Sequence, residues 1–212
     1  DPFIYDSSGT LLTLLHWRIP SQAQWVPLLD TRLLSRLASG RKTESYFPVA
    51  VANNKFHCII LKGELYPYFP PPLLSEFDFQ VPLCNPRKAR DENTLTEDDE
   101  SANLEQEFVL RSIVTTQKQD LINHTKSSLN QKSDLQRARL EIDKTLLKLL
   151  NCECRESEDR GMRALELVRL FQDRTGRMIE AAVKIAERYE RNVLSSKIRE
   201  IGESILADRD QN

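Results

Sequence analysis

Proline and aromatic residues are nearly absent from the second half of the sequence. All ten prolines lie at or before Pro86, and only three of the fifteen aromatic residues lie beyond residue 100. Proline fixes the backbone φ angle and removes a hydrogen-bond donor, so its absence from residues 87–212 removes the main obstacle to long helices there. That segment is also rich in Leu, Glu, Lys and Arg, which favour helix. Two architectures therefore share the chain.

The sequence also lacks the marks of several protein classes. Four cysteines in 212 residues are too few for a disulfide-dense secreted scaffold, which favours a reducing compartment such as the cytoplasm or nucleus. A transmembrane helix needs about 18 uninterrupted apolar residues, and the sequence has no such run, so we expect no membrane partner. The formal net charge of -2 provides no general attraction to nucleic acid or to an anionic membrane.

Motifs for catalysis and for metal binding are missing as well. The sequence has no glycine-rich phosphate loop, nucleophile elbow or metalloprotease helix, and its three histidines are scattered. Cys152 and Cys154 could give two thiolates to zinc, but a structural site needs four ligands and the other candidates are distant in sequence. We therefore predict free thiols, no metal, no cofactor and no enzymatic activity.

Residues 1–86 repeat a pattern of short apolar runs separated by turn residues. Asp6-Ser7-Ser8-Gly9 can close a hairpin because aspartate supplies a local hydrogen bond and glycine accepts a positive φ angle, and Asn53-Asn54 can form a second turn. Short strands at this spacing are typical of a sandwich, a barrel or four-stranded propeller blades. The expected strands are Phe3–Tyr5, Leu11–Leu15, Trp25–Leu29, Tyr46–Ala52, Phe56–Leu61 and a final run within Leu73–Leu83.

The length of this first region limits what it can form. A propeller blade takes roughly 40 residues, so residues 1–86 could supply about two blades, which cannot close a ring. Either the other blades precede Asp1, or the region is a different small β domain. Because the sequence begins with aspartate rather than methionine, we expect it to be a piece of a longer protein.

Residues 87–103 form an acidic segment. Six carboxylates lie between Asp91 and Glu100, with almost no apolar residues among them. This composition predicts a solvated linker, with a regulatory acidic tail as the alternative.

Residues 104–212 have the apolar spacing of helices. Because heptads are not sustained and the apolar arcs are wide, the pattern predicts a bundle of about five helices rather than a two-stranded coiled coil. Gly161 is expected to separate the second helix from the third, and Thr175 to cap the fourth. The expected helices are Leu104–Asn123, Ser133–Asn151, Met162–Gln172, a fourth after Thr175, and a last one over Leu194–Ile205 that is separate from the fourth or continuous with it.

The second and fourth of these helices carry the candidate site. The second helix has one apolar face of Leu135, Ala138, Ile142, Leu146 and Leu149 and a second stripe of Leu140, Leu147 and Leu150, which together are wider than one buried side requires. Ala181 and Ile185 share a face of the fourth helix. Small residues such as Ala181 allow close approach of another helix. The residues that line the gap between the second and fourth helices could therefore receive an amphipathic peptide. The alternative is that they are ordinary bundle core.

The same region is crowded with charge of both signs. Ten basic residues from Arg160 to Arg199 are interleaved with glutamates from Glu156 to Glu200. Such mixtures at helical spacing usually form a solvated, mutually paired face. The basic residues could instead bind nucleic acid, or steer an acidic peptide toward the groove.

Several segments in the same order resemble a known family. Together they are similar to the chromosome transmission fidelity replisome-hub family of fungi, whose animal counterpart is the acidic nucleoplasmic DNA-binding protein. Members of that family have N-terminal WD repeats, then a second β-propeller, then a helical bundle. The sequence departs from them in lacking the WD repeats, most of the second propeller and the basic DNA-binding box of the animal proteins. The segments are WVPLLDT at Trp25–Thr31, FHCIILKGELYPYFPPPLL within Tyr46–Leu83, LEQEFVLRSI at Leu104–Ile113, ELVRLF at Glu166–Phe171 and AAVKIAERY at Ala181–Tyr189.

This resemblance implies a fold and a role. The fold would be β plus α in several domains: the last blades of a WD40-like β-propeller in residues 1–86, the acidic linker 87–103, and the helical bundle 104–212. The role would be that of a nuclear, non-enzymatic homotrimer assembled through its propellers, acting in DNA replication and sister chromatid cohesion.

The resemblance also implies partners. Such a hub would tether the replicative helicase, through a subunit of the GINS complex, to the catalytic subunit of DNA polymerase alpha. Each client would dock a short helical motif on the bundle, at or near Leu146, Leu149, Leu150, Ala181 and Ile185. Binding to chromatin or DNA, and a purely structural oligomerisation role, remain as alternatives.

Overall fold

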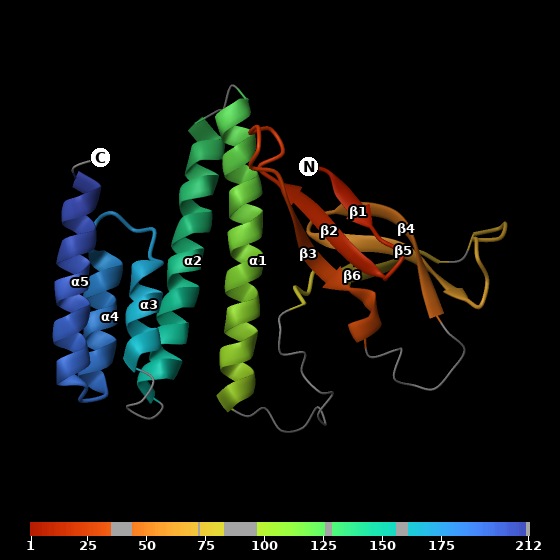
Figure 1. The fold of residues 1–212 in the computed structure, drawn as a ribbon. Helices are drawn as coiled ribbons and strands as arrows, with labels where there is room; N and C mark the ends of the chain where they lie inside the picture. Colours follow the sequence, from red (N-terminus) through yellow and green to blue (C-terminus); the bar gives the residue numbers. More distant parts are fainter. Residues whose placement is uncertain (35–43, 72, 83–96, 126–128, 156–160, 211–212) are drawn as a thin grey trace. The chain divides into compact units, whose positions relative to one another are not determined.

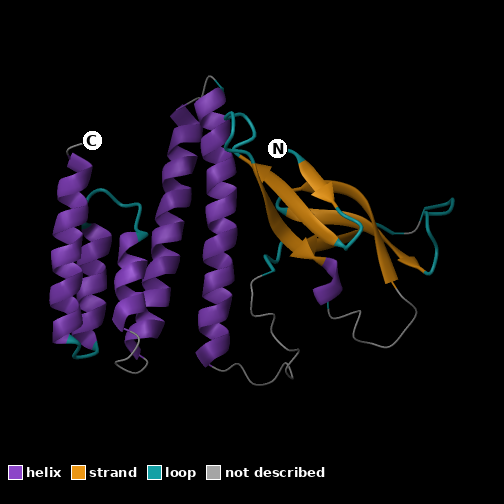
Figure 2. Cartoon of the chain, viewed as in Figure 1, coloured by secondary structure: helices purple, strands orange, loops and turns teal. Residues whose placement is uncertain are grey.

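The computed structural model divides the chain into two compact units, Asp1–Thr94 and Leu95–Asn212. The first unit is built of strands and the second of helices (Figures 1 and 2). The structure describes residues 1–34, 44–71, 73–82, 97–125, 129–155 and 161–210.

Within the described residues, the β unit has two antiparallel three-stranded sheets. The first has the order β1 (Phe3–Tyr5), β2 (Thr10–Leu15), β3 (Gln24–Asp30) and is followed by the short 3-10 helix η1 (Thr31–Leu33). The second has the order β4 (Glu44–Ala52), β5 (Lys55–Lys62), β6 (Ser75–Asp78). All six predicted strand regions are therefore confirmed, with small differences at their ends.

The predicted turns connect these strands for the reasons expected. The Asp6 side chain accepts hydrogen bonds from the backbone N–H groups of Ser8 and Thr10, at 2.9 and 2.8 Å. Gly9 has a φ angle of +86°, while Asn53 and Asn54 have +52° and +59°. Glycine and asparagine adopt these angles at low cost, so both hairpins close tightly.

Alternation along β2 positions the core of the β unit. Leu11, Thr13 and Leu15 are all buried, as expected for every second residue of a strand that covers a core. The rings of Tyr5 and Phe56 stack with their centroids 5.2 Å apart and join the two sheets. Each sheet has three strands in the described part of the chain, so a propeller of four-stranded blades is not shown and stays a prediction.

The helical unit contains five helices, which confirms the predicted bundle. They pack as neighbours in the order α1 on α2, α2 on α3 and α4, and α5 on α3 and α4 (Figure 1). The helices are α1 (Glu97–His124), α2 (Leu129–Arg155), α3 (Gly161–Arg169), α4 (Arg177–Arg188) and α5 (Asn192–Asp210).

Helix α1 begins at Glu97 rather than at Leu104, inside the segment predicted as a linker. Ser101 is buried, and Arg155 of α2 lies 3.1 Å from the carboxylate of Glu100. These contacts with a neighbouring helix extend α1 through residues whose composition alone suggests a solvated coil. Residues 87–96 of the predicted linker lie outside the described residues.

The start of α4 corrects the predicted cap. Gly176, in the left-handed conformation, is the N-cap residue and makes no side-chain hydrogen bond. The Asp173 carboxylate instead accepts hydrogen bonds from the backbone N–H groups of Thr175 and Met178, at 3.0 and 3.2 Å. The carboxylate wins because it carries full charge and reaches both groups, whereas the Thr175 hydroxyl donates its own hydrogen bond to Asp173.

Helices α4 and α5 are separate. Glu190 has a φ angle of +59°, and the N–H of Arg191 donates to the carbonyl oxygen of Ala186 at 3.0 Å, which is the pattern of a Schellman motif. The chain then reverses direction into α5, which continues past Gly202 to Asp210.

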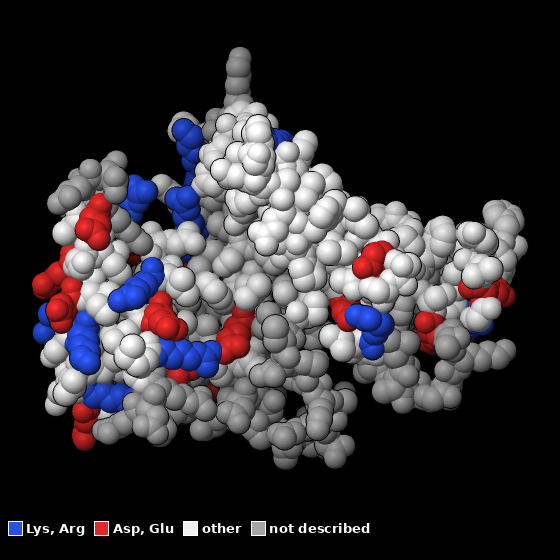
Figure 3. All heavy atoms as spheres, viewed as in Figure 1, with Lys and Arg blue, Asp and Glu red and all other residues white. Residues whose placement is uncertain are grey.

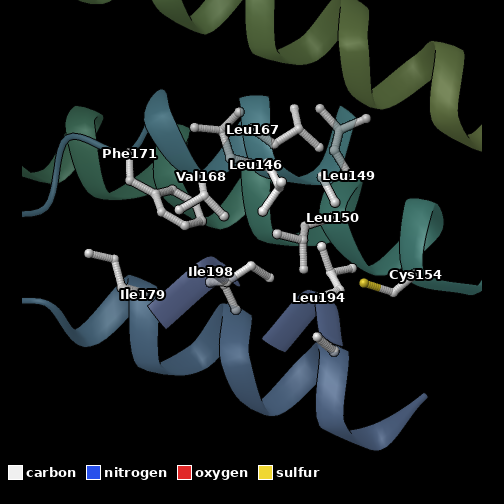
Figure 4. Close-up of a cluster of buried hydrophobic side chains, with 14 of the residues drawn as sticks. Leu146, Leu149, Leu150, Cys154, Leu167, Val168, Phe171, Ile179, Leu194 and Ile198 are labelled. Carbon is white, nitrogen blue, oxygen red and sulfur yellow. The ribbon is translucent and has the colours of Figure 1, made fainter. Parts of the chain in front are cut away.

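The hydrophobic core of the bundle lies between α2, α3, α4 and α5 (Figure 4). Helix α1 adds Leu104 to it. Its fully covered members include Ile142, Val168, Ala182 and Ile198. Burying each large aliphatic side chain contributes roughly 1.5–3 kcal/mol, so this cluster is the main source of stability of the unit.

Candidate functional site

The three leucines predicted to line a groove are core residues. Leu146, Leu149 and Leu150 are at most 1% exposed. Figure 4 shows them in the space between helices, together with Val168 and Ile198. Their placement at a docking surface is therefore corrected: the wide apolar face of α2 is needed to cover α3, α4 and α5.

Ala181 and Ile185 have a different environment. Both are partly buried, so each keeps some surface open to a partner, and Ile185 packs against the core from outside. Their prediction as peptide-binding residues stays a prediction, because their accessibility is necessary for binding but does not demonstrate it.

The surface beside them is formed by α2 and α4, which pack on each other and run in the same direction (Figure 1). A hydrogen bond shows which residues of the two helices lie at the same level: the Tyr189 hydroxyl of α4 donates to Oδ1 of Asn151 of α2 at 3.2 Å. One helical turn earlier on each helix are Leu147 and Ile185, which are both partly buried against the core.

Together these side chains form one surface. On α2, Leu140, Leu147 and Asn151 lie on one face, at spacings of seven and four residues. On α4, Ala181, Ile185 and Tyr189 follow one another every fourth residue. We define the α2–α4 strip as Leu147, Asn151, Ala181, Ile185 and Tyr189. It is an apolar surface with one polar pair at its end.

Sequence reasoning missed part of this strip. Leu147 belongs to a visible second stripe of α2 with Leu140, and Tyr189 shares a helical face with Ile185, so both left a signal in the apolar spacing. Asn151 gives no such signal in the sequence, because only the packing of α4 on α2 brings its side chain to Tyr189. The register between two helices is a tertiary property.

Exposed basic residues border the strip, while the wider surface of the helical unit carries charges of both signs. Lys148 of α2 and Lys184 and Arg188 of α4 are exposed, and Lys144 pairs with Glu141 at 2.7 Å. On α5, Arg199 lies 3.3 Å from the carboxylate of Glu187. Figure 3 shows Lys and Arg interleaved with Asp and Glu over the face of the helical unit in view. The surface there is mixed, as the sequence predicts.

The described cysteines are buried thiols. Cys58, Cys152 and Cys154 are buried and stand outside any disulfide, and burial raises the pKa of Cys58 to about 11 and that of Cys154 above its ordinary value. A thiol with a raised pKa is a poor nucleophile at neutral pH, so neither residue is suited to covalent chemistry. Cys84 lies outside the described residues.

The part of the chain that the structure describes offers neither a metal site nor a membrane-spanning helix. No group of three or more His, Cys, Asp or Glu side chains is placed to hold a metal ion there. Within the same ranges, none of the helices combines the length and apolar character that crossing a membrane requires.

Two protein-family models match the chain. The model described as "Minichromosome loss protein, Mcl1, middle region" matches residues 1–83. The model described as "DNA polymerase alpha-binding protein Ctf4, C-terminal domain" matches residues 102–208. The second match spans the helical unit and includes the entire α2–α4 strip.

Two curated proteins are similar to nearly all of the chain. The chain is 42% identical over 200 residues to Minichromosome loss protein 1 of Schizosaccharomyces pombe, a match that covers 93% of the chain and 23% of that protein. It is 31% identical over 232 residues to the DNA polymerase alpha-binding protein of Saccharomyces cerevisiae, covering 96% of the chain and 24% of that protein. The chain thus spans about a quarter of the length of these relatives.

Proposed function

The chain belongs to the Ctf4 family of DNA polymerase alpha-binding proteins, and from this membership we propose that it is part of a non-enzymatic replisome adaptor in the nucleus. Its bundle docks short amphipathic helices of client proteins on the α2–α4 strip. The proposed clients are the catalytic subunit of DNA polymerase alpha and a subunit of the GINS complex, so that the adaptor couples the replicative helicase to the polymerase.

The observation that carries this proposal is the α2–α4 strip itself. Two parallel helices present partly buried apolar side chains, with Leu147 and Ile185 each one helical turn before the hydrogen-bonded pair of Asn151 and Tyr189. A third helix with apolar residues at positions i, i+4 and i+7 can lie along such a strip and cover both rows. Ala181 adds little bulk, which lets the incoming backbone come close.

The charges around the strip favour one kind of peptide. Lys148, Lys184 and Arg188 border it on both helices, so acidic residues flanking the apolar positions of a client would be attracted. Rim charges of this kind change the association rate and its salt dependence more than the final affinity. We therefore expect clients with acidic amphipathic motifs.

The proposed assembly is a homotrimer formed through the β unit. The support for this assembly is a set of large apolar side chains in the segment between β5 and β6. The β unit leaves them uncovered: Phe69 is 93% exposed and Leu73 is 92% exposed. A contiguous exposed apolar segment of this size commonly marks an interface. Three copies would present three strips, which raises the effective concentration of weakly held clients.

The test is a titration of the full chain with fluorescent amphipathic peptides from the polymerase alpha catalytic subunit and from GINS subunits, followed by fluorescence anisotropy. We expect saturable binding, and a loss of affinity of at least about 100-fold in the double variant Ala181→Glu, Ile185→Glu, because two carboxylates would be desolvated without partners. Circular dichroism checks that the bundle remains folded.

The matched control introduces two glutamates elsewhere on the same unit. Leu121→Glu with Leu129→Glu changes two exposed apolar residues on α1 and at the start of α2 and should leave peptide affinity within about twofold, since neither residue lies on the strip. The proposal fails if no peptide binds, or if the Ala181 and Ile185 variant binds as tightly as the unmodified chain. Binding that falls steeply with salt and ignores both pairs would indicate a nucleic-acid surface instead.

A further inference from the structure

A second concave surface lies on the helical unit, away from the α2–α4 strip. It is a cleft with a volume of about 610 Å³ between the start of α3, the turn that joins α4 to α5, and the first turns of α5. We call it the α3–α5 cleft and define it by Met162, Leu165, Arg191, Val193, Leu194 and Lys197. Clefts of roughly 300–1,000 Å³ are large enough for a few side chains of a ligand.

The walls of the α3–α5 cleft are apolar and exposed. Met162 is 70% exposed and Val193 is 74% exposed, whereas Leu165 and Leu194 are buried beneath them and form the floor. Large apolar side chains on helices normally turn toward the core when the core has room. Here both side chains line the hollow and leave apolar surface that a side chain of a ligand can cover.

The charge around the cleft is mainly positive. Arg191 and Lys197 contribute two cations, and Glu190 on the turn is the one acidic residue among those that line it in the described structure. The first turn of α5 carries no acidic residue, and the backbone N–H groups of Asn192, Val193 and Leu194 precede the first hydrogen bond within the helix, from Ser195 to Arg191. Unpaired N–H groups at a helix start favour a carboxylate.

From this combination we infer that the α3–α5 cleft is a second docking site, which takes a short acidic protein segment carrying a large apolar side chain. The apolar side chain inserts between Met162 and Val193. A neighbouring carboxylate is held by Lys197, Arg191 and the start of α5. Because the cleft uses different residues from the α2–α4 strip, the two sites can be filled together, and one copy of the chain can hold two partner segments.

The experiment uses the 15N-labelled full chain and two blocked tetrapeptides, Asp-Asp-Leu-Phe and Lys-Lys-Leu-Phe, followed by NMR. The acidic probe should shift the backbone resonances of residues 161–165 and 191–197 in a saturable manner, and should bind more tightly than the basic probe. Lys197→Glu should lower the affinity of the acidic probe about fivefold, since an attractive exposed charge pair is replaced by a repulsive one. The ratio of the affinities of the acidic and basic probes should therefore decrease or invert.

Two further variants separate this site from the α2–α4 strip. Val193→Glu should weaken the acidic probe at least about tenfold, by removing apolar contact and adding a like charge. Ile185→Glu should leave the probe's affinity at the cleft unchanged. The inference is overturned if the two probes bind equally or not at all, if Lys197→Glu leaves their ratio unchanged, or if the shifted resonances lie on α2 and α4.

Discussion

At the scale of single residues, the approach of α5 to α4 depends on the missing side chain of Gly202. A Cβ atom at this position would lie 2.4 Å from Cγ2 of Ile179. A glycine inside a helix normally weakens it by about 1 kcal/mol relative to alanine. Glycine is nevertheless required at this position, because a larger residue would prevent α5 from packing this closely against α4.

Gly202→Ala is therefore expected to destabilise the helical unit by about 1–3 kcal/mol, since the clash with Ile179 outweighs the gain in helix propensity. The free energy of unfolding by urea measures the change. Gly161→Ala is the matched control, because a Cβ at Gly161 would meet no atom within 4 Å, and it should have little effect. The packing explanation also requires that Ile179→Ala and Gly202→Ala be non-additive, with the double variant less damaged than the sum of the single ones.

Asp173 is a second residue whose effect on stability is specific. Burial raises its pKa, but the hydrogen bonds from Thr175, Met178 and Arg177 outweigh burial, so the pKa lies below the ordinary value of 3.8. A lowered folded-state pKa means that the carboxylate stabilises the fold above the unfolded-state pKa and that this contribution is lost as the pH falls through the folded-state pKa.

Asp173→Asn should lower the stability of the unit by about 0.5–2 kcal/mol at pH 7, which is the usual cost of losing such a cap. The difference from the unmodified chain should shrink as the pH falls below about 4, because protonation removes the same charge from Asp173. Thermal unfolding at several pH values measures it. A difference that stayed constant down to pH 2 would contradict the assignment of the cap to the charged carboxylate.

At the scale of helices and strands, neighbouring residues on one helix serve different purposes. Leu146 of α2 is covered by the core, while Leu147, next in sequence, is partly open on the α2–α4 strip. Helical geometry turns successive side chains by about 100°, so two adjacent leucines can belong to separate surfaces. A bundle helix such as α2, which packs against α1, α3 and α4, can therefore support a core and a docking surface at once.

The turn between α4 and α5 gives a prediction at this scale. Glu190 holds a φ angle of +59°, which a residue with a side chain adopts at a cost, whereas glycine adopts it freely. Glu190→Gly should therefore raise the stability of the unit by about 0.5–1 kcal/mol. Urea unfolding provides the measurement. The same substitution three residues earlier, Glu187→Gly, lies inside α4 and should cost about 1 kcal/mol; equal effects at both positions would argue against the Schellman motif.

At the scale of the whole molecule, the chain combines a β unit and a helical unit of different character. The β unit leaves large apolar side chains uncovered between β5 and β6, and the helical unit carries the α2–α4 strip and the α3–α5 cleft. If the β unit assembles copies and the helical unit binds segments of partners, assembly and binding can be changed separately by mutation.

Phe69→Asp with Leu73→Asp tests this separation. Both residues are almost fully exposed, so the double variant should keep the thermal midpoint of the unmodified chain while its self-association is lost. Multi-angle light scattering should show a trimeric mass for the unmodified chain and a monomeric mass for the variant. Peptide affinity per copy should not change. A trimeric mass in both would place the assembly elsewhere.

The sequence alone determined the features that depend on neighbours along the chain. Proline and turn residues before Pro86 predicted strands and hairpins, and apolar spacing after residue 104 predicted five helices, because both signals arise within about one turn or one pleat. The segments that resemble the replisome-hub family led to the family that the chain belongs to. Composition placed residues 97–103 in a linker, whereas the structure makes them the first turns of α1, where Arg155 of α2 lies 3.1 Å from the carboxylate of Glu100.

Tertiary structure decided which apolar residues are buried in the core and which remain exposed at the surface. The same periodic leucines on α2 could have faced a partner or the protein's own helices, and the positions of α3, α4 and α5 put Leu146, Leu149 and Leu150 in the core and left Leu147 at the surface. It also set the register that joins Asn151 to Tyr189 and brought Met162 and Val193 to the same cleft. Whether a side chain is buried depends on contacts with elements far away in the sequence, so a local pattern of apolar residues cannot predict it.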